Sequence, residues 1–142
     1  MLKIVTNSPA QTEAFAEKIG QRVKPATVIA FFGGLGMGKT AFTRGLARGM
    51  GIKADVASPT FAIVNDYGGN PPLVHFDMYK VESWDDLYSS GFFDYLDMGA
   101  VLAVEWSENI ENALPEGTVR VSISQGEDEN QRIITVEGID EE

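Results

Sequence analysis

Residues 27–40 read TVIAFFGGLGMGKT, and this stretch decides the fold class. Its first part, TVIAFF, is almost continuously apolar, which is typical of a strand that is buried on both faces. A glycine-rich segment follows, and from Lys39 onward apolar residues recur every four positions, at Phe42, Leu46 and Met50, which predicts a helix. Strand, glycine loop and helix therefore come in the order that a phosphate-binding loop requires.

The glycine-rich segment fits the pattern G-x-x-x-x-G-K-[ST] through Gly33, Gly38, Lys39 and Thr40. Glycine tolerates positive φ, so successive N–H groups can point into one concavity, and the helix N-terminus adds its positive dipole end. Lys39 supplies a charge for the outer phosphates, and the Thr40 hydroxyl can ligate Mg²⁺. The predicted nucleotide-binding residues are Gly33, Gly34, Leu35, Gly36, Met37, Gly38, Lys39, Thr40 and Ala41.

Such a site also needs a carboxylate for the metal or its waters, usually at the end of a buried strand. Glu105 closes the apolar run of residues 100–104, and Asp77 lies in the run of residues 73–79. Because Mg²⁺ keeps several waters, one carboxylate beside Thr40 suffices, and the other acid can orient the attacking water. The residues alone leave open which acid touches the metal.

Three further positions carry weaker signals. Thr60, in the segment SPTF, is either a switch residue that reaches the metal or the γ-phosphate, or part of an ordinary Ser-Pro turn. His75 stands among apolar residues in the middle of a predicted strand, which favours a hydrogen-bonded structural histidine over a catalytic base. Trp106 is interpreted as an aromatic residue packed in the core, although its place directly after Glu105 puts it near the nucleotide.

The rest of the chain predicts an α/β fold, a three-layer sandwich of the P-loop NTPase type, with residues 1–142 as one domain. Ser8, followed by Pro9 and three residues later by Gln11, marks a helix start, and Ser83 marks another. We expect a mixed, largely parallel sheet that ends in an antiparallel edge hairpin. Its further strands are predicted at 2–6, 61–67, 73–79, 119–124 and 132–136, and the turn-rich GGNPP makes the pair 61–67 and 73–79 antiparallel.

The composition excludes several classes of protein. The chain has 142 residues, no cysteine and one histidine, which rules out disulfides and a histidine-rich zinc site. Its net charge of −10 is opposite in sign to that of a free-standing duplex-binding domain. No apolar run approaches the ~20 residues of a membrane span, so we expect a cytoplasmic protein that makes no contact with membranes.

Arg44 and Arg48, one turn apart, indicate a solvated helix face or a docking surface.

Taken together, the motifs resemble the TsaE family of tRNA threonylcarbamoyladenosine biosynthesis ATPases. That family's pattern of phosphate loop, S-P-T-[FY], H-x-D-x-Y-[RK] and strand-end E-W appears here as GGLGMGKT, Ser58–Phe61, His75–Lys80 and Glu105-Trp106. The resemblance runs from Thr12 to Arg132. It departs at Gly34, where the family usually has an acid, at Ala41 and at Lys80, where arginine is more frequent, but no catalytic group is lost.

The resemblance implies a weak ATPase that uses ATP and Mg²⁺. By position in the motifs, Lys39, Thr60, Asp77 and Glu105 are the implied catalytic residues, and Thr40 and Glu105 the implied metal ligands. The resemblance also implies TsaB and TsaD as partners, which this protein resets between turnovers, with tRNA contacted only indirectly through the complex. Two other functions remain open: a small-molecule kinase, for which the sequence shows no arginine-rich lid, and a nucleotide-dependent binding module without turnover.

Overall fold

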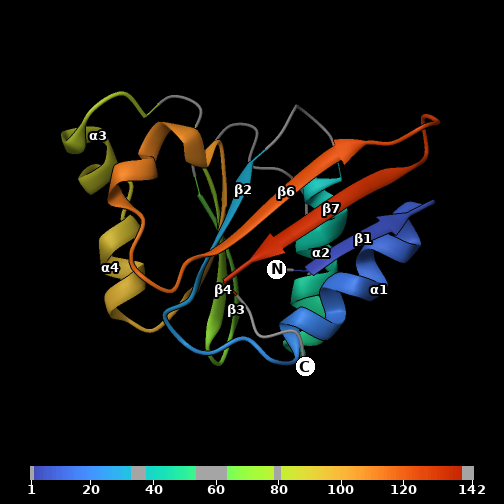
Figure 1. The fold of residues 1–142 in the computed structure, drawn as a ribbon. Helices are drawn as coiled ribbons and strands as arrows, with labels where there is room; N and C mark the ends of the chain where they lie inside the picture. Colours follow the sequence, from blue (N-terminus) through green and yellow to red (C-terminus); the bar gives the residue numbers. More distant parts are fainter. Residues whose placement is uncertain (1, 33–37, 54–63, 79–80, 139–142) are drawn as a thin grey trace.

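The computed structural model describes residues 2–32, 38–53, 64–78 and 81–138, and its central layer is a seven-stranded sheet (Figure 1). The strands follow the order β1-β7-β6-β2-β5-β4-β3. Their bounds are β1 (Leu2–Thr6), β2 (Val28–Phe32), β3 (Val64–Gly69), β4 (Pro72–Asp77), β5 (Val101–Glu105), β6 (Val119–Gln125) and β7 (Arg132–Glu137). The four central strands β6, β2, β5 and β4 are parallel. The expected mixed α/β sheet is confirmed.

Antiparallel pairs lie at both edges of this parallel core. At one edge β3 pairs with β4, as the short GGNPP connection predicts, with Val64 opposite Phe76. At the other edge β6 and β7 form the predicted hairpin. Strand β1 then pairs on the outer side of β7, with Leu2 opposite Val136. The hairpin is therefore not the edge of the sheet, as had been expected, because the outermost strand is the first strand of the chain.

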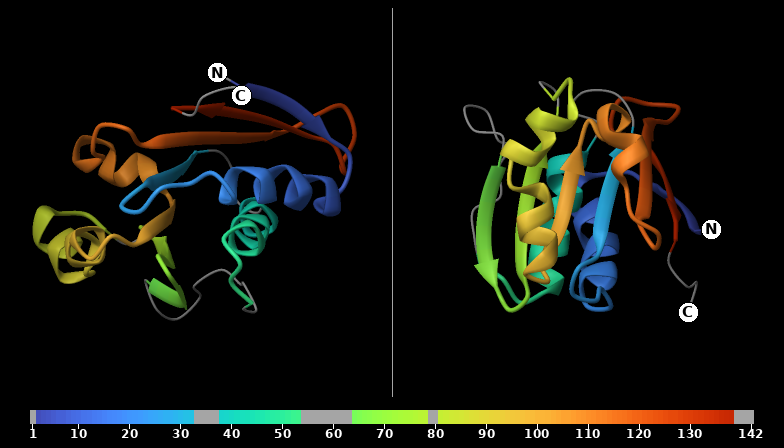
Figure 2. Two further views of the ribbon diagram at one scale, coloured as in Figure 1. Left: turned by 90° about the horizontal axis from the view of Figure 1, so that it is seen from below. Right: turned by 90° about the vertical axis from the view of Figure 1, so that its left-hand side faces the viewer.

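Helices cover the two faces of the sheet (Figure 2). Helices α1 (Pro9–Gly20) and α2 (Lys39–Gly49) pack on one face. The other face carries α3 (Trp84–Ser89), α4 (Phe92–Asp97) and the 3₁₀ segment η1 (Ser107–Ala113). Because side chains alternate along a strand, β5 sends Val101 and Ala103 into the first core and Leu102 and Val104 into the second. The three-layer prediction is therefore correct.

Both predicted helix starts are present. The Ser8 hydroxyl accepts from the Gln11 backbone N–H at 3.2 Å, and the Gln11 side chain accepts from the Asn7 backbone N–H at 2.7 Å. At α3 the Ser83 hydroxyl accepts from the Asp86 backbone N–H at 3.1 Å. These contacts satisfy backbone donors that have no partner inside a helix. No helix in the described ranges combines the length and the apolar character needed to cross a membrane.

Ion pairs tie α2 to α1 and account for the two arginines that the sequence left ambiguous. Arg44 lies 3.4 Å from Glu13, and Arg48 pairs with Glu13 and Glu17. Both arginine side chains remain about half exposed. They lie on the solvated side of α2 and bridge it to α1. Exposed pairs of this kind contribute modestly, roughly 0.2–1 kcal/mol each.

Glycines allow the two helices to approach closely. A Cβ atom added at Gly45 would meet the Glu13 carbonyl oxygen and would lie 2.7 Å from the Ala16 Cβ. A Cβ atom at Gly49 would meet the Glu17 carbonyl oxygen, and one at Gly20 would meet that of Leu46. The nearest neighbour at each of the three glycines is a backbone carbonyl oxygen of a packed helix, so a side chain there requires the helices to separate.

We expect Gly45→Ala to destabilise the protein, although alanine is the better helix former. The clash with α1 should cost about 2 kcal/mol and lower the melting temperature by roughly 5 °C. At an open helical position the same change would stabilise the protein by about 1 kcal/mol. Thermal unfolding decides between these signs, and a raised melting temperature would contradict the close contact.

Candidate nucleotide-binding site

The helix that the phosphate-loop pattern predicts begins at the expected residue. Lys39 is the first residue of α2 and is 2% exposed, and Thr40 and Ala41 complete the start of its first turn. Gly38 precedes the helix with φ of +96°, a conformation that side-chain-bearing residues rarely adopt. Residues 33–37 of the loop and Thr60 lie outside the described residues, so their predicted roles stay predictions.

The two candidate acids end neighbouring strands. Strands β2, β5 and β4 are adjacent and parallel, so their carboxyl ends meet at one edge of the sheet. Asp77 is the last residue of β4, Glu105 is the last residue of β5, and the two are register partners. Because β2 runs into the glycine loop from this same edge, both acids lie where a nucleotide-binding site is predicted.

The Glu105 carboxylate is held by a buried histidine. The two side chains lie on the same face of the sheet, because Leu73, Val101 and Ala103, at alternate positions before them, belong to the core under α1 and α2. His75 is fully buried, and its Nε2 lies 2.6 Å from Glu105 Oε2. Glu105 itself is 9% exposed.

A tyrosine lies on the other side of the imidazole. Its hydroxyl, at Tyr67 on β3, is 3.4 Å from His75 Nδ1. An ionised carboxylate can only accept, so Nε2–H donates to Glu105. In a neutral imidazole Nδ1 is then left to accept from the tyrosine O–H. Tyr67, His75 and Glu105 thus form a line of polar contacts from the edge of the sheet to the end of β5.

His75 was expected to be a hydrogen-bonded structural residue, and it is hydrogen-bonded, but its link to a site acid was not predicted. A partial signal existed, because His75 and Asp77 share one face of β4 by the alternation of a strand. The pairing with Glu105 depends on the parallel register of β4 and β5, and their separation in the chain hides that register. Tyr67 was also missed: it lies just before the predicted β3–β4 turn, where the register shifts between Asp66 and Gly69.

Trp106 turns the chain sharply out of β5. Its backbone has φ of 59° and ψ of 41°, the left-handed region, which a bulky residue occupies at a cost of about 1–3 kcal/mol. Its ring packs partly against the second core. The Lys39 Nζ lies 5.6 Å from the centre of this ring. The tryptophan therefore packs partly against the core, as favoured from the sequence, and also lies beside the phosphate-loop lysine, a contact that was not predicted.

The oxygen donors at this edge suit a hard cation. The candidates are the Thr40 hydroxyl and the Glu105 carboxylate, and Mg²⁺ prefers oxygen ligands while it keeps several waters. Within the part of the chain that the structure describes, no cluster of three or more His, Asp or Glu side chains could hold a metal by itself. A hydroxyl and one carboxylate fit a magnesium ion that takes its other ligands from water and phosphate.

Comparison with known proteins agrees with the motifs. A family model described as "Threonylcarbamoyl adenosine biosynthesis protein TsaE" matches residues 6–134. A TsaE protein of Bacillus subtilis (strain 168) is 39% identical over 139 residues, which are 96% of this chain and 87% of that protein. A TsaE protein of Treponema pallidum (strain Nichols) is 33% identical over 132 residues, covering 93% of this chain and 98% of that protein.

A solved structure agrees as well. The crystal structure of Bacillus subtilis YdiB matches with a TM-score of 0.78 and 35% sequence identity, over 95% of this chain and 83% of that one. With a family model over most of its length and relatives of this similarity, the chain belongs to the TsaE family.

Proposed function

We propose that this protein is an ATP-binding, slowly ATP-hydrolysing accessory protein in the biosynthesis of threonylcarbamoyladenosine in tRNA. The printed names of its relatives assign them to this biosynthesis. The observation that carries the ATPase activity is the start of α2 at Lys39, at the strand edge that also holds Glu105 and Asp77. Helix, lysine and carboxylates together meet the needs of phosphoryl transfer.

Each residue of the site has a role under this proposal. The α2 N-terminus, Lys39 and the loop 33–38 bind the phosphates, while Thr40 and Glu105 hold the metal. Mg²⁺, when bound, neutralises the charge that develops on the phosphoryl oxygens. Asp77 orients the attacking water, and Thr60 contacts the metal or the γ-phosphate as a switch-like residue. The His75 contact occupies one oxygen of Glu105, which leaves the other to face the metal or its waters.

The partners under this proposal are TsaB and TsaD, in the cytoplasm. ATP hydrolysis would reset that pair between turnovers, and the threonylcarbamoyl group would be transferred by the pair itself. Direct binding of tRNA by this chain is disfavoured, because its 21 acidic residues outnumber its 11 basic residues. Phosphates would be repelled by most of such a surface.

ATP hydrolysis measured alone and with TsaB and TsaD tests this proposal. We expect slow turnover by the protein alone and a several-fold increase with the pair. Lys39→Ala should remove both rates, because the lysine contacts the phosphates in either state. If the wild-type protein releases phosphate no faster than Lys39→Ala in every mixture, the protein is a nucleotide-binding module without turnover. Phosphate transfer to a small molecule would instead indicate a kinase.

A further inference from the structure

The negative charge of the protein is concentrated on one side of the sheet. Residues 81–119 contain nine of the 21 acidic residues and none of the 11 basic residues, so the remainder of the chain is nearly neutral. Apart from strand β5 of the sheet, which ends in Glu105, these residues include α3, α4 and η1, the layer opposite α1 and α2. On the α1–α2 face the acids Glu13 and Glu17 are matched by arginines. The two faces therefore differ sharply in charge.

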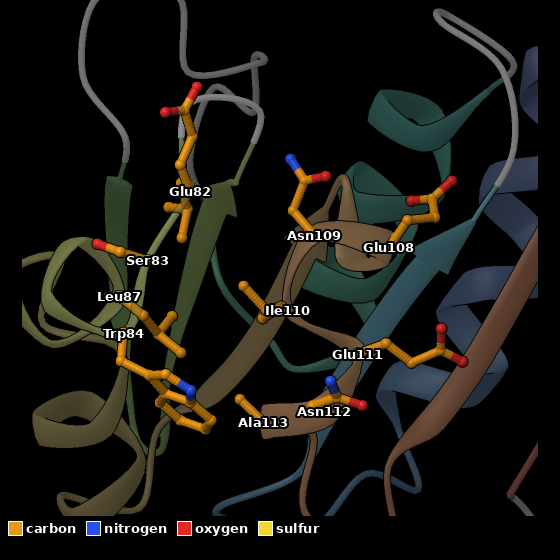
Figure 3. Close-up of a pocket in the computed structure, with 11 residues that line it drawn as sticks. Glu82, Ser83, Trp84, Leu87, Glu108, Asn109, Ile110, Glu111, Asn112 and Ala113 are labelled. Atoms are coloured by element: carbon orange, nitrogen blue, oxygen red, sulfur yellow. The ribbon is translucent and has the colours of Figure 1, made fainter.

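A groove of about 260 Å³ lies in this acidic layer, between α3 and η1 (Figure 3). Its floor is apolar and is formed by Val81, Leu87 and Ile110, all at most 5% exposed. Its lining also includes Glu82, Glu108 and Glu111; in Figure 3 the Glu108 and Glu111 carboxylates extend from η1 away from α3, and Glu111 pairs with Arg120 at 3.3 Å. An apolar floor with acidic residues around it suits the aliphatic stem and the charged end of a lysine or arginine side chain.

An exposed aromatic residue stands on the α3 side of the groove. The Trp84 ring points from α3 toward η1 and is 55% exposed (Figure 3). It lies 6.3 Å from the ring of Tyr88, which is 62% exposed. Tryptophan, tyrosine and arginine are enriched among the residues that dominate protein interfaces, and a cation attracts the face of a tryptophan ring. The rings of Trp84 and Tyr88 are more than half exposed in this chain, so only a binding partner would bury them.

We propose that this groove is the docking site for a segment of a protein partner that carries lysine or arginine. The assignment rests on the proposed function, in which the chain works with other proteins. Charge selects the occupant, because the layer offers carboxylates and no cation of its own between residues 81 and 119. The same charge repels RNA. The volume is also below the roughly 300–1,000 Å³ of pockets that enclose small-molecule ligands.

Docking at this groove would act on segments that adjoin the nucleotide site. Its two walls are the segments that leave β4 after Asp77 and β5 after Glu105. The Asn109 side chain donates to the Met78 carbonyl at 2.8 Å, and the Met78 N–H donates to the Glu105 carbonyl at 3.0 Å. A partner held between these walls therefore contacts elements that are joined by hydrogen bonds to the backbone of a site acid.

The test uses two probes and two single variants, Trp84→Ala and Glu108→Lys. The first probe is a short peptide of alternating arginine and glycine, observed through the indole N–H signals of the two tryptophans, with Trp84→Phe for assignment. We expect the peptide to shift the Trp84 signal and to lose affinity as salt is raised. The second probe is the TsaB–TsaD pair, for which both variants should weaken binding by about tenfold or more.

Glu127→Lys is the matched control, because it makes the same charge change at an exposed position in the turn between β6 and β7. It should bind both probes within about twofold of the wild type, and all three variants should keep the wild-type melting temperature and ATP affinity. An unshifted Trp84 signal, or groove variants that bind the pair as tightly as Glu127→Lys, would overturn the docking site.

Transfer RNA serves as a third probe, and a shift of the Trp84 signal by tRNA would overturn the choice of a basic protein partner. Failure of the proposed function has a different signature. In that case the peptide still shifts the Trp84 signal, but the wild-type protein does not bind TsaB–TsaD at all. This result would support the groove as a binding site for basic segments and would refute the partnership with TsaB and TsaD.

Discussion

Replacement of Glu105 by glutamine should reduce ATP hydrolysis by about 10²-fold or more while the fold survives. Glutamine keeps the size of the side chain, and its amide oxygen can still accept from His75 Nε2, which lies 2.6 Å from the native carboxylate. The negative charge that would hold the metal is lost. Because that charge acts on the metal, the Mg²⁺ concentration needed for ATP binding should rise as well. Single-turnover hydrolysis and Mg²⁺ titrations of ATP binding measure the two effects.

Asp77→Asn is the informative comparison, because it makes the same chemical change at the register partner of Glu105. If Asp77 orients the attacking water, its variant should also lose most hydrolysis but should depend on Mg²⁺ almost as the wild type does. Glu108→Gln, at an exposed position three residues after Glu105, controls for a general loss of negative charge. Wild-type turnover by Glu105→Gln would refute the assignment of the metal-binding carboxylate, and equal Mg²⁺ dependence in the two site variants would refute the division of roles.

The features that the sequence could predict are those that depend on neighbours in the chain. The glycine pattern and the change of periodicity at Lys39 placed the start of α2 correctly. The serine caps at Ser8 and Ser83 are equally local, since each hydroxyl bonds a backbone N–H three residues on. Strand β5 was predicted because a run of apolar residues ends in an acid.

The features that escaped prediction depend on how distant segments pair. Strand β1 lies outside β7, at the opposite end of the chain, and nothing in residues 2–6 encodes that choice. The helical spacing of Arg44 and Arg48 placed them on one side of α2, but their acidic partners come from α1. The contact between His75 and Glu105 needs the register of two parallel strands, which a crossover of more than twenty residues separates.

That contact leads to the second large expected effect. His75→Leu should weaken Mg²⁺-dependent ATP binding and hydrolysis by about 10- to 100-fold, the usual cost of removing a residue that orients a metal ligand. Leucine fills the buried site but cannot donate, so the Glu105 carboxylate, only 12% exposed, loses its hydrogen bond and can turn away from the metal. The imidazole touches no reacting atom under this proposal and acts only by positioning Glu105.

His75→Gln separates positioning from a purely structural role. The glutamine side-chain amide has a reach similar to that of Nε2 and can donate to Glu105. His75→Gln should therefore keep a large part of the wild-type response to Mg²⁺, which His75→Leu loses. ATP binding without Mg²⁺ should be unchanged in both variants, because under the proposed function the phosphates contact α2 and not β4. Tyr67→Phe, which removes the hydroxyl 3.4 Å from Nδ1, should have a smaller effect in the same direction. If both His75 variants lose stability and metal-free ATP binding to the same extent, the histidine only fills the core. If His75→Gln keeps the Mg²⁺ response and His75→Leu loses it, the hydrogen bond from residue 75 positions the Glu105 carboxylate.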